Sequence, residues 1–177
     1  MLMYVKIPQD RIGAVIGPKG ITKKALEELS TATLDIDSES GNVQVLSPED
    51  PLQGMRAVEV ISAIGRGFSP ERAVKLFDDE LLIYDVINIP ANSPKLLTRV
   101  RGRIIGSGGK TRTLIESITH VDLSVYGKTV AIIGYPEQVH VAKTAVDMLI
   151  DGAPHSVVYG FIEKKRRELT AKGLEYY

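Results

Sequence analysis

An internal repeat in this chain of 177 residues constrains its fold more than any other feature. Residues 15–22, VIGPKGIT, resemble residues 104–111, IIGSGGKT, which lie 89 positions further along the chain. The second copy has a turn that is two residues shorter, and after this turn the similarity continues between residues 43–46 and 130–133. Because a repeat of this length corresponds to one folding unit, the sequence predicts two copies of the same small domain.

Each copy shows the same order of predicted elements: strand, helix, helix, strand, strand and helix. Alternating apolar residues indicate strands, and apolar residues spaced three and four apart indicate helices. In the first copy we expect a strand at 2–7, a short amphipathic turn at 12–16, a helix at 21–29, a hairpin at 33–37 and 43–45, and a helix that starts within 47–50. In the second copy we expect a strand at 81–89, helices at 95–105 and 110–118, a hairpin at 121–126 and 129–133, and a helix near Pro136.

The predicted copies span residues 1–69 and 81–153, with a connector between them and an extension after them. The connector, 70–80, follows a serine and begins with proline, which is typical of a capped helix start. We therefore expect a short helix that is stiffer than a Gly/Ser linker. The extension, 154–177, has apolar residues at helical spacing, so we expect a C-terminal helix that packs back on the body.

Charge is distributed unevenly along the chain, although the formal net charge is zero. Residues 1–80 carry four more acidic than basic side chains, and residues 81–177 carry four more basic than acidic ones. No acidic residue falls between Asp85 and Glu116, a window that contains six Lys or Arg residues. A basic cluster of this kind is typical of polyanion binding, and a solvated helix face gives the same pattern.

The composition excludes several classes of protein. Apolar residues make up 44% and charged residues 25%, as in ordinary globular domains, so disordered and collagen-like chains are excluded. The absence of cysteine excludes disulfides, thiolate metal sites and cysteine nucleophiles. No stretch approaches the ~20 apolar residues of a membrane span, and residues 1–6 lack the layout of a signal peptide. We therefore expect no membrane partner and a cytoplasmic location.

The Gly-x-x-Gly breaks at 17–20 and 106–109 are candidate binding sites. Without Cβ atoms at the flanking positions, the backbone can approach a ligand closely, and the N–H groups that open the next helix favour an anion. Each break follows two apolar residues, which offer an apolar floor, and has Lys or Arg close by. A phosphodiester backbone with its bases over the apolar groove matches this combination. A plain helix–helix turn is the alternative, which two copies with the same flanks disfavour.

With VIGPKG at 15–20 and IIGSGG at 104–109, the chain resembles KH domains, in which this GXXG loop clamps about four nucleotides of a single strand. The resemblance covers residues 1–153. It implies an α+β protein with two type I KH domains of the order β-α-α-β-β-α, each a three-stranded antiparallel sheet packed against three helices, plus a C-terminal helix.

The tandem layout and the basic segment 96–103 are further similar to archaeal relatives of a eukaryotic pre-ribosomal KH protein. That resemblance implies RNA binding in rRNA processing and ribosome biogenesis, near the 3′ end of small-subunit rRNA. It also implies partners such as the rRNA dimethyltransferase and the 3′-end endonuclease, or other ribosome-assembly or translation-initiation proteins.

We expect RNA contact mainly in the second copy. The first copy has acidic neighbours, and its loop contains Pro18, which lacks an N–H donor. The predicted clamp of the second copy consists of Ile105, Gly106, Ser107, Gly108, Gly109 and Lys110, with Arg101, Arg103 and Arg112 as phosphate partners. The corresponding candidates in the first copy are Ile16, Gly17, Pro18, Lys19 and Gly20.

Two other functions stay open at this point. Residues 106–111, GSGGKT, end like the phosphate loop of a nucleotide hydrolase, but position 104 is Ile where that loop requires its first glycine. A KH-fold scaffold that binds proteins and little RNA is the second alternative. The three histidines, His120, His140 and His155, are isolated, and no nucleophile or metal-ligand pattern is present, so we expect neither catalysis nor a cofactor or metal.

Overall fold

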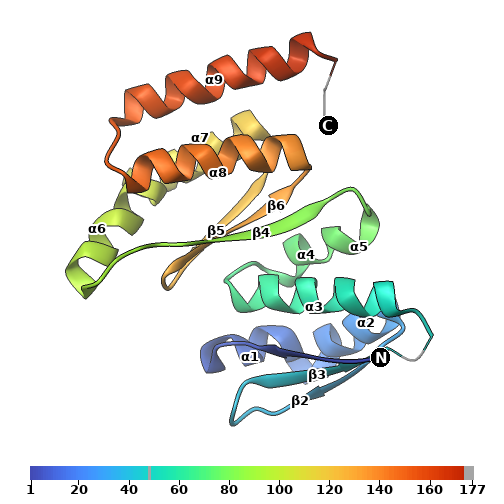
Figure 1. The fold of residues 1–177 in the computed structure, drawn as a ribbon. Coiled ribbons are helices and arrows are strands. Elements are labelled where there is room, and N and C mark those ends of the chain that lie inside the picture. Colours follow the sequence, from blue (N-terminus) through green and yellow to red (C-terminus); the bar gives the residue numbers. More distant parts are fainter. Residues whose placement is uncertain (48, 174–177) are drawn as a thin grey trace. The chain divides into compact units, whose positions relative to one another are not determined.

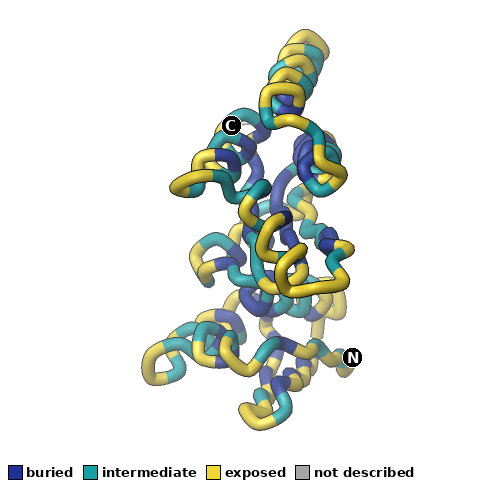
Figure 2. The backbone as a smooth tube through the Cα atoms, turned by 90° about the vertical axis from the view of Figure 1, so that its left-hand side faces the viewer, coloured by how far each residue is buried: buried dark blue, intermediate teal, exposed yellow. Residues whose placement is uncertain are grey.

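The computed structural model describes residues 1–47 and 49–173. The chain forms two compact units that divide between Tyr84 and Asp85, called unit 1 and unit 2. Each unit contains one three-stranded sheet and several helices (Figure 1). The core of each unit lies between its sheet and its helices, where the buried residues concentrate (Figure 2).

Unit 1 shows the predicted order of elements. These are β1 (Leu2–Lys6), α1 (Gln9–Ile16), a 3-10 turn (Pro18–Gly20), α2 (Ile21–Ser30), β2 (Thr33–Ile36), β3 (Asn42–Leu46) and α3 (Pro51–Gly65). The strands are antiparallel in the order β1-β3-β2. Alternation along β3 sends Val43 and Val45 into the core, where both are fully buried. The helices supply Leu26, Ile61 and Ile64 to the same core.

The start of α3 differs from the prediction, which placed it within residues 47–50. The helix begins at Pro51 because Asp50 caps it: the Asp50 carboxylate accepts from the backbone N–H groups of Leu52 at 3.0 Å and Gln53 at 3.4 Å. Ser47 instead extends the sheet, since its N–H donates to the carbonyl of Met1 at 2.9 Å. Pro48, part of the predicted start, lies outside the described residues.

The predicted connector helix is two short helices, α4 (Pro70–Ala73) and α5 (Lys75–Asp78). The predicted serine cap is present, because the Arg72 N–H donates to the Ser69 hydroxyl at 3.4 Å. Both helices pack against α3, and Leu76 is fully buried. The connector is therefore part of the core of unit 1 rather than a free linker.

Unit 2 repeats the order of elements and adds a long helix. Its elements are β4 (Ile83–Asn88, which starts before the division), α6 (Pro94–Ile105), a 3-10 turn (Ser107–Gly109), α7 (Lys110–Thr119), β5 (Asp122–Tyr126), β6 (Thr129–Gly134), α8 (Pro136–Ile150) and α9 (His155–Ala171). The sheet has the order β4-β6-β5. The α+β class and the repeated β-α-α-β-β-α order are thus confirmed.

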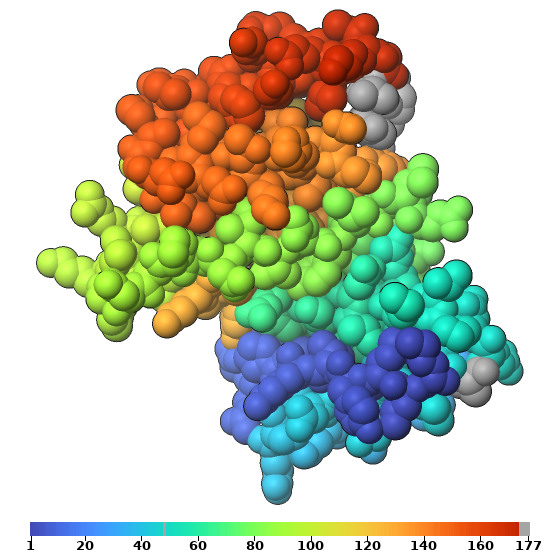
Figure 3. Space-filling model, in the orientation of Figure 1, coloured from blue at the N-terminus to red at the C-terminus, as the bar shows by residue number. Residues whose placement is uncertain are grey.

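The C-terminal helix α9 packs on α7 and α8 of its own unit and lies along α8 in the space-filling view (Figure 3). Val158 and Ile162 of α9 are fully buried in the apolar core of unit 2. Residues 174–177 of the predicted extension lie outside the described residues. Within residues 1–47 and 49–173, no helix is both long and apolar enough to cross a membrane.

Candidate nucleic-acid interface

The first loop, residues 17–20, and the second loop, residues 106–109, have the same backbone conformation. The first position has a φ of 74° in one loop and 77° in the other, and the last has 72° and 77°. The third position is also left-handed in both, with a φ of 54° at Lys19 and 60° at Gly108. Each loop joins two helices through a single 3-10 turn, so the predicted break is present in both units.

The first glycine of each loop is required by a close contact with the helix that follows. A Cβ at Gly106 would lie 2.3 Å from Oγ1 of Thr111, and a Cβ at Gly17 would lie 2.2 Å from Oγ1 of Thr22. The threonine common to both repeats is therefore the residue against which the loop backbone packs.

The second loop presents two unpaired backbone donors. The N–H of Gly106 donates to the carbonyl of Gly102 at 2.8 Å, and that of Gly109 donates to the carbonyl of Gly106 at 3.2 Å. Between them, the N–H groups of Ser107 and Gly108 bond no acceptor in the described part of the chain. Both residues are exposed, so both donors can reach a ligand. Neighbouring open amides at the start of a helix form an anion-binding arrangement.

The first loop presents only half of this donor pair. Pro18 has no N–H, which leaves the N–H of Lys19 as its counterpart. Lys19 also adopts a left-handed conformation that costs a residue with a Cβ about 1 kcal/mol. The acidic neighbour Glu27 accepts from the N–H of Leu34 at 3.0 Å, beyond the far end of α2, and Glu116 holds the equivalent position in unit 2.

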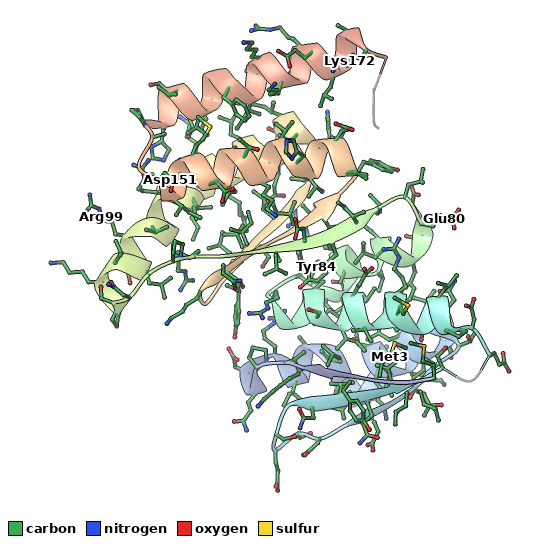
Figure 4. All side chains as sticks on the ribbon, viewed as in Figure 1. Met3, Glu80, Tyr84, Arg99, Asp151 and Lys172 are labelled. Carbon is green, nitrogen blue, oxygen red and sulfur yellow. The ribbon has the colours of Figure 1, made fainter. Side chains whose placement is uncertain are left out.

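The basic side chains around the second loop differ in how available they are. Lys110 is exposed at the start of α7, and Arg99 projects from α6 away from the body of unit 2 (Figure 4). The side chain of Arg112 is 42% exposed and lies 3.5 Å from the Glu116 carboxylate. Arg101 is half-buried, and its Nε is buried without a partner in the described residues.

The guanidinium of Arg103 contacts backbone carbonyls. Its Nε donates to the carbonyl of Leu149 at 3.0 Å, and its Nη2 donates to the carbonyl of Ala153. These carbonyls belong to the end of α8 and the residues after it, so Arg103 satisfies acceptors that the helix end leaves open. These bonds engage two of the five guanidinium N–H groups, and the role of Arg103 as a phosphate partner stays a prediction.

Unit 1 contains an equivalent contact that the sequence did not reveal. Arg11 donates from Nε to the carbonyl of Ile64 and from Nη2 to that of Phe68, both at 2.9 Å. Arg11 precedes its loop by six residues and Arg103 precedes its loop by three, so aligning the repeats does not pair them.

The apolar residues before the loops, Ile16 and Ile105, are half-buried, which leaves part of each side chain open at the surface beside its loop. His155 and Tyr159 of α9 contact unit 2 next to the second loop. Sequence reasoning missed both contacts, because their partners are a backbone carbonyl and a distant hydroxyl. Among the residues that the structure describes, no group of three or more His, Cys, Asp or Glu side chains could hold a metal ion.

Comparison with known proteins adds family information to this geometry. Residues 82–167 match the model of the eukaryotic-type KH domain, type I, and residues 3–67 match the model of the KH domain. A KH domain-containing protein of Methanocaldococcus jannaschii is 43% identical, over 98% of this chain and 78% of the relative. The pre-rRNA-processing protein pno1 of Schizosaccharomyces pombe is 30% identical, over 63% of this chain and 47% of the relative, so the chain spans about half of that protein.

A solved structure also matches nearly the whole chain. It is the complex of a/eIF2alpha, aDim2p and rRNA from Pyrococcus horikoshii OT3, with a TM-score of 0.89 and 46% identity. The match covers 96% of each chain. The similarity therefore extends over both units and includes most of their connecting elements.

Proposed function

We propose, from the premise that this chain belongs to the tandem KH-domain family of Dim2p and PNO1, that it binds single-stranded RNA and acts in assembly of the small ribosomal subunit. The observation that carries the proposal is the pair of open N–H groups at Ser107 and Gly108. They lie next to an exposed lysine and a half-exposed isoleucine, which gives a phosphate site beside an apolar surface.

The RNA-binding residues of the proposal are those of the second loop and its flanks. We retain Ile105, Gly106, Ser107, Gly108, Gly109 and Lys110, with Arg101 and Arg112 as phosphate partners, and we omit Arg103 because two of its N–H groups donate to carbonyls at the end of α8. In the first loop, Ile16, Gly17, Pro18, Lys19 and Gly20 form a weaker site, since one open amide replaces two. A protein-binding role for unit 1 accords with this weaker site.

The proposed target is the 3′ region of small-subunit rRNA. The solved relative in complex with rRNA and a/eIF2alpha supports an RNA partner together with a translation or ribosome-assembly protein, and the pno1 relative supports pre-rRNA processing. A non-catalytic role and a cytoplasmic location belong to the same proposal.

A binding titration tests the proposal. A labelled oligoribonucleotide with an archaeal small-subunit rRNA 3′ sequence should bind in single-stranded form and bind at least tenfold more weakly when annealed to its complement, because stacked and paired bases cannot enter a KH groove. The logarithm of affinity should fall with that of salt with a shallow slope, since the clamp engages only about four nucleotides. Equal affinity for both forms would overturn the proposal, and measurable ATP or GTP turnover would favour the hydrolase alternative.

A further inference from the structure

We propose that α9, a helix outside the β-α-α-β-β-α unit, positions the second loop for RNA through His155 and Tyr159. This inference rests on the proposed function, because it concerns the same loop. Each of the two residues contacts a residue on one side of the loop, and these contacts hold the loop on both flanks.

The first contact fixes the end of α6. Nε2 of His155 lies 3.0 Å from the carbonyl oxygen of Arg103. Because a carbonyl oxygen only accepts, Nε2 carries the proton and donates. In an uninterrupted helix this carbonyl would accept from the N–H of Ser107, four residues on. The positive φ of Gly106 ends the helix and leaves the Ser107 donor open for a phosphate, and His155 satisfies the carbonyl that is left without that partner.

The second contact fixes the start of α7. The hydroxyl groups of Tyr159 and Thr111 lie 2.9 Å apart. Thr111 is only 3% exposed, and its Oγ1 is the atom to which a Cβ at Gly106 would lie nearest. The hydrogen bond between Tyr159 and Thr111 therefore restrains the side chain against which the loop backbone packs.

Helix α9 is held firmly enough to transmit this constraint. Val158, between the two positioning residues, is fully buried, as is Ile162 one turn further on. The rings of His155 and Tyr159 also contact each other, with centroids 6.0 Å apart. Arg103 is fixed in addition by its bonds to the end of α8, so the loop flank has few alternative positions.

Unit 1 lacks this device at the equivalent place. In each unit one arginine donates to two backbone carbonyls, an arrangement called here an arginine fork. Phe68 of unit 1 and Ala153 of unit 2 correspond, since each supplies the second of these carbonyls. Counted from them, His155 corresponds to Pro70 and Tyr159 to Val74. Neither proline nor valine has a side-chain donor. Only the second loop is therefore positioned from the following helix, which gives a structural reason for expecting the stronger RNA site there.

The test compares two matched tyrosine substitutions in the full chain. Tyr159→Phe removes the hydroxyl that contacts Thr111, and Tyr84→Phe removes a hydroxyl that lies 2.9 Å from the Ser62 hydroxyl in unit 1. Burial raises the pKa of Tyr84, so its hydroxyl remains neutral at the pH of the assay. We expect Tyr159→Phe to weaken binding of the 3′-rRNA oligoribonucleotide about three- to tenfold, the loss of one hydrogen bond, and Tyr84→Phe to leave it unchanged.

A second pair of variants separates positioning from stability. Thr111→Ser keeps the hydroxyl and should retain affinity, whereas Thr111→Val should weaken binding as much as Tyr159→Phe does. The two losses should not add in the double variant, because they break the same bond. His155→Gln, whose amide can donate in place of Nε2, should bind RNA better than His155→Leu.

Amide chemical shifts of Ser107 and Gly108, measured without RNA, give a readout independent of affinity. Relative to the unmodified chain, these shifts should change in Tyr159→Phe and remain the same in Tyr84→Phe. Equal RNA affinities for Tyr159→Phe and Tyr84→Phe, or unmoved amides, would overturn the role of α9 while leaving RNA binding by the chain intact. Failure of the unmodified chain to bind RNA would overturn both the proposed function and the role of α9 in RNA binding. The amide chemical shifts would still show in that case whether α9 holds the loop.

Discussion

Placing two carboxylates in each loop in turn measures how RNA binding is divided between the two units. The variants are Ser107→Asp with Gly108→Asp in the second loop, and Pro18→Asp with Lys19→Asp in the first. All four positions are exposed, so the cores stay untouched. By charge alone the first-loop variant is the larger change, because it also deletes a lysine.

The expected magnitude follows from the charges and the open amides. A carboxylate about 4 Å from a phosphate repels it by about 1 kcal/mol in water, somewhat less at 0.1 M salt. Two carboxylates beside the donors of Ser107 and Gly108 should weaken binding at least tenfold, which corresponds to about 1.4 kcal/mol. The first-loop variant should cost less, because only the Lys19 amide is open there.

The assay is fluorescence anisotropy with the 3′-rRNA oligoribonucleotide, after circular dichroism has shown that each variant is folded. Ser107→Asn with Gly108→Asn is the neutral control, since asparagine also tolerates the left-handed conformation of position 108. The control should bind within about threefold of the unmodified chain, about 0.6 kcal/mol. Comparable losses from both Asp variants would show that the two grooves share the RNA, and a loss confined to the first-loop variant would refute the asymmetry.

Three further expectations concern stability and charge. Lys19→Gly should raise the free energy of unfolding by about 0.5–1 kcal/mol in urea titrations, because it relieves a left-handed residue that has a Cβ. Gly106→Ala should lower it by more than 2 kcal/mol, since its Cβ would lie 2.3 Å from Oγ1 of Thr111, whereas Gly20→Ala, whose Cβ meets nothing within 4 Å, should lower it by about 1 kcal/mol. Arg103→Met should lower the thermal unfolding midpoint and leave the salt dependence of RNA affinity nearly unchanged. Arg112→Met should leave the midpoint unchanged and reduce the slope of log affinity against log salt by about one. The opposite pattern would show that Arg103 binds a phosphate.

The repeat and its local chemistry were sufficient to predict the elements of both units and the two loops. Apolar periodicity is a local signal, and Gly17 and Gly106 are demanded by contacts only five residues away. The start of α3 was misplaced because Ser47 and Asp50 are both good caps, and only the pairing of Ser47 with Met1 across the sheet decides between them. The contacts of Arg103 were not predicted for a related reason: its partners, the carbonyls of Leu149 and Ala153, carry no residue-specific signature.

The two arginine forks have a consequence for exchanging parts between the halves. Arg11 lies near the start of α1 and Arg103 near the end of α6. Both nevertheless donate to the backbone carbonyl of the penultimate residue of a fifteen-residue helix, Ile64 of α3 or Leu149 of α8. The two repeats therefore make the same bond with side chains at non-equivalent positions. A chimera that moves α1 with its loop into unit 2 would carry the arginine nearly one turn out of place. Such grafts should fold only when the partner helix travels with the loop.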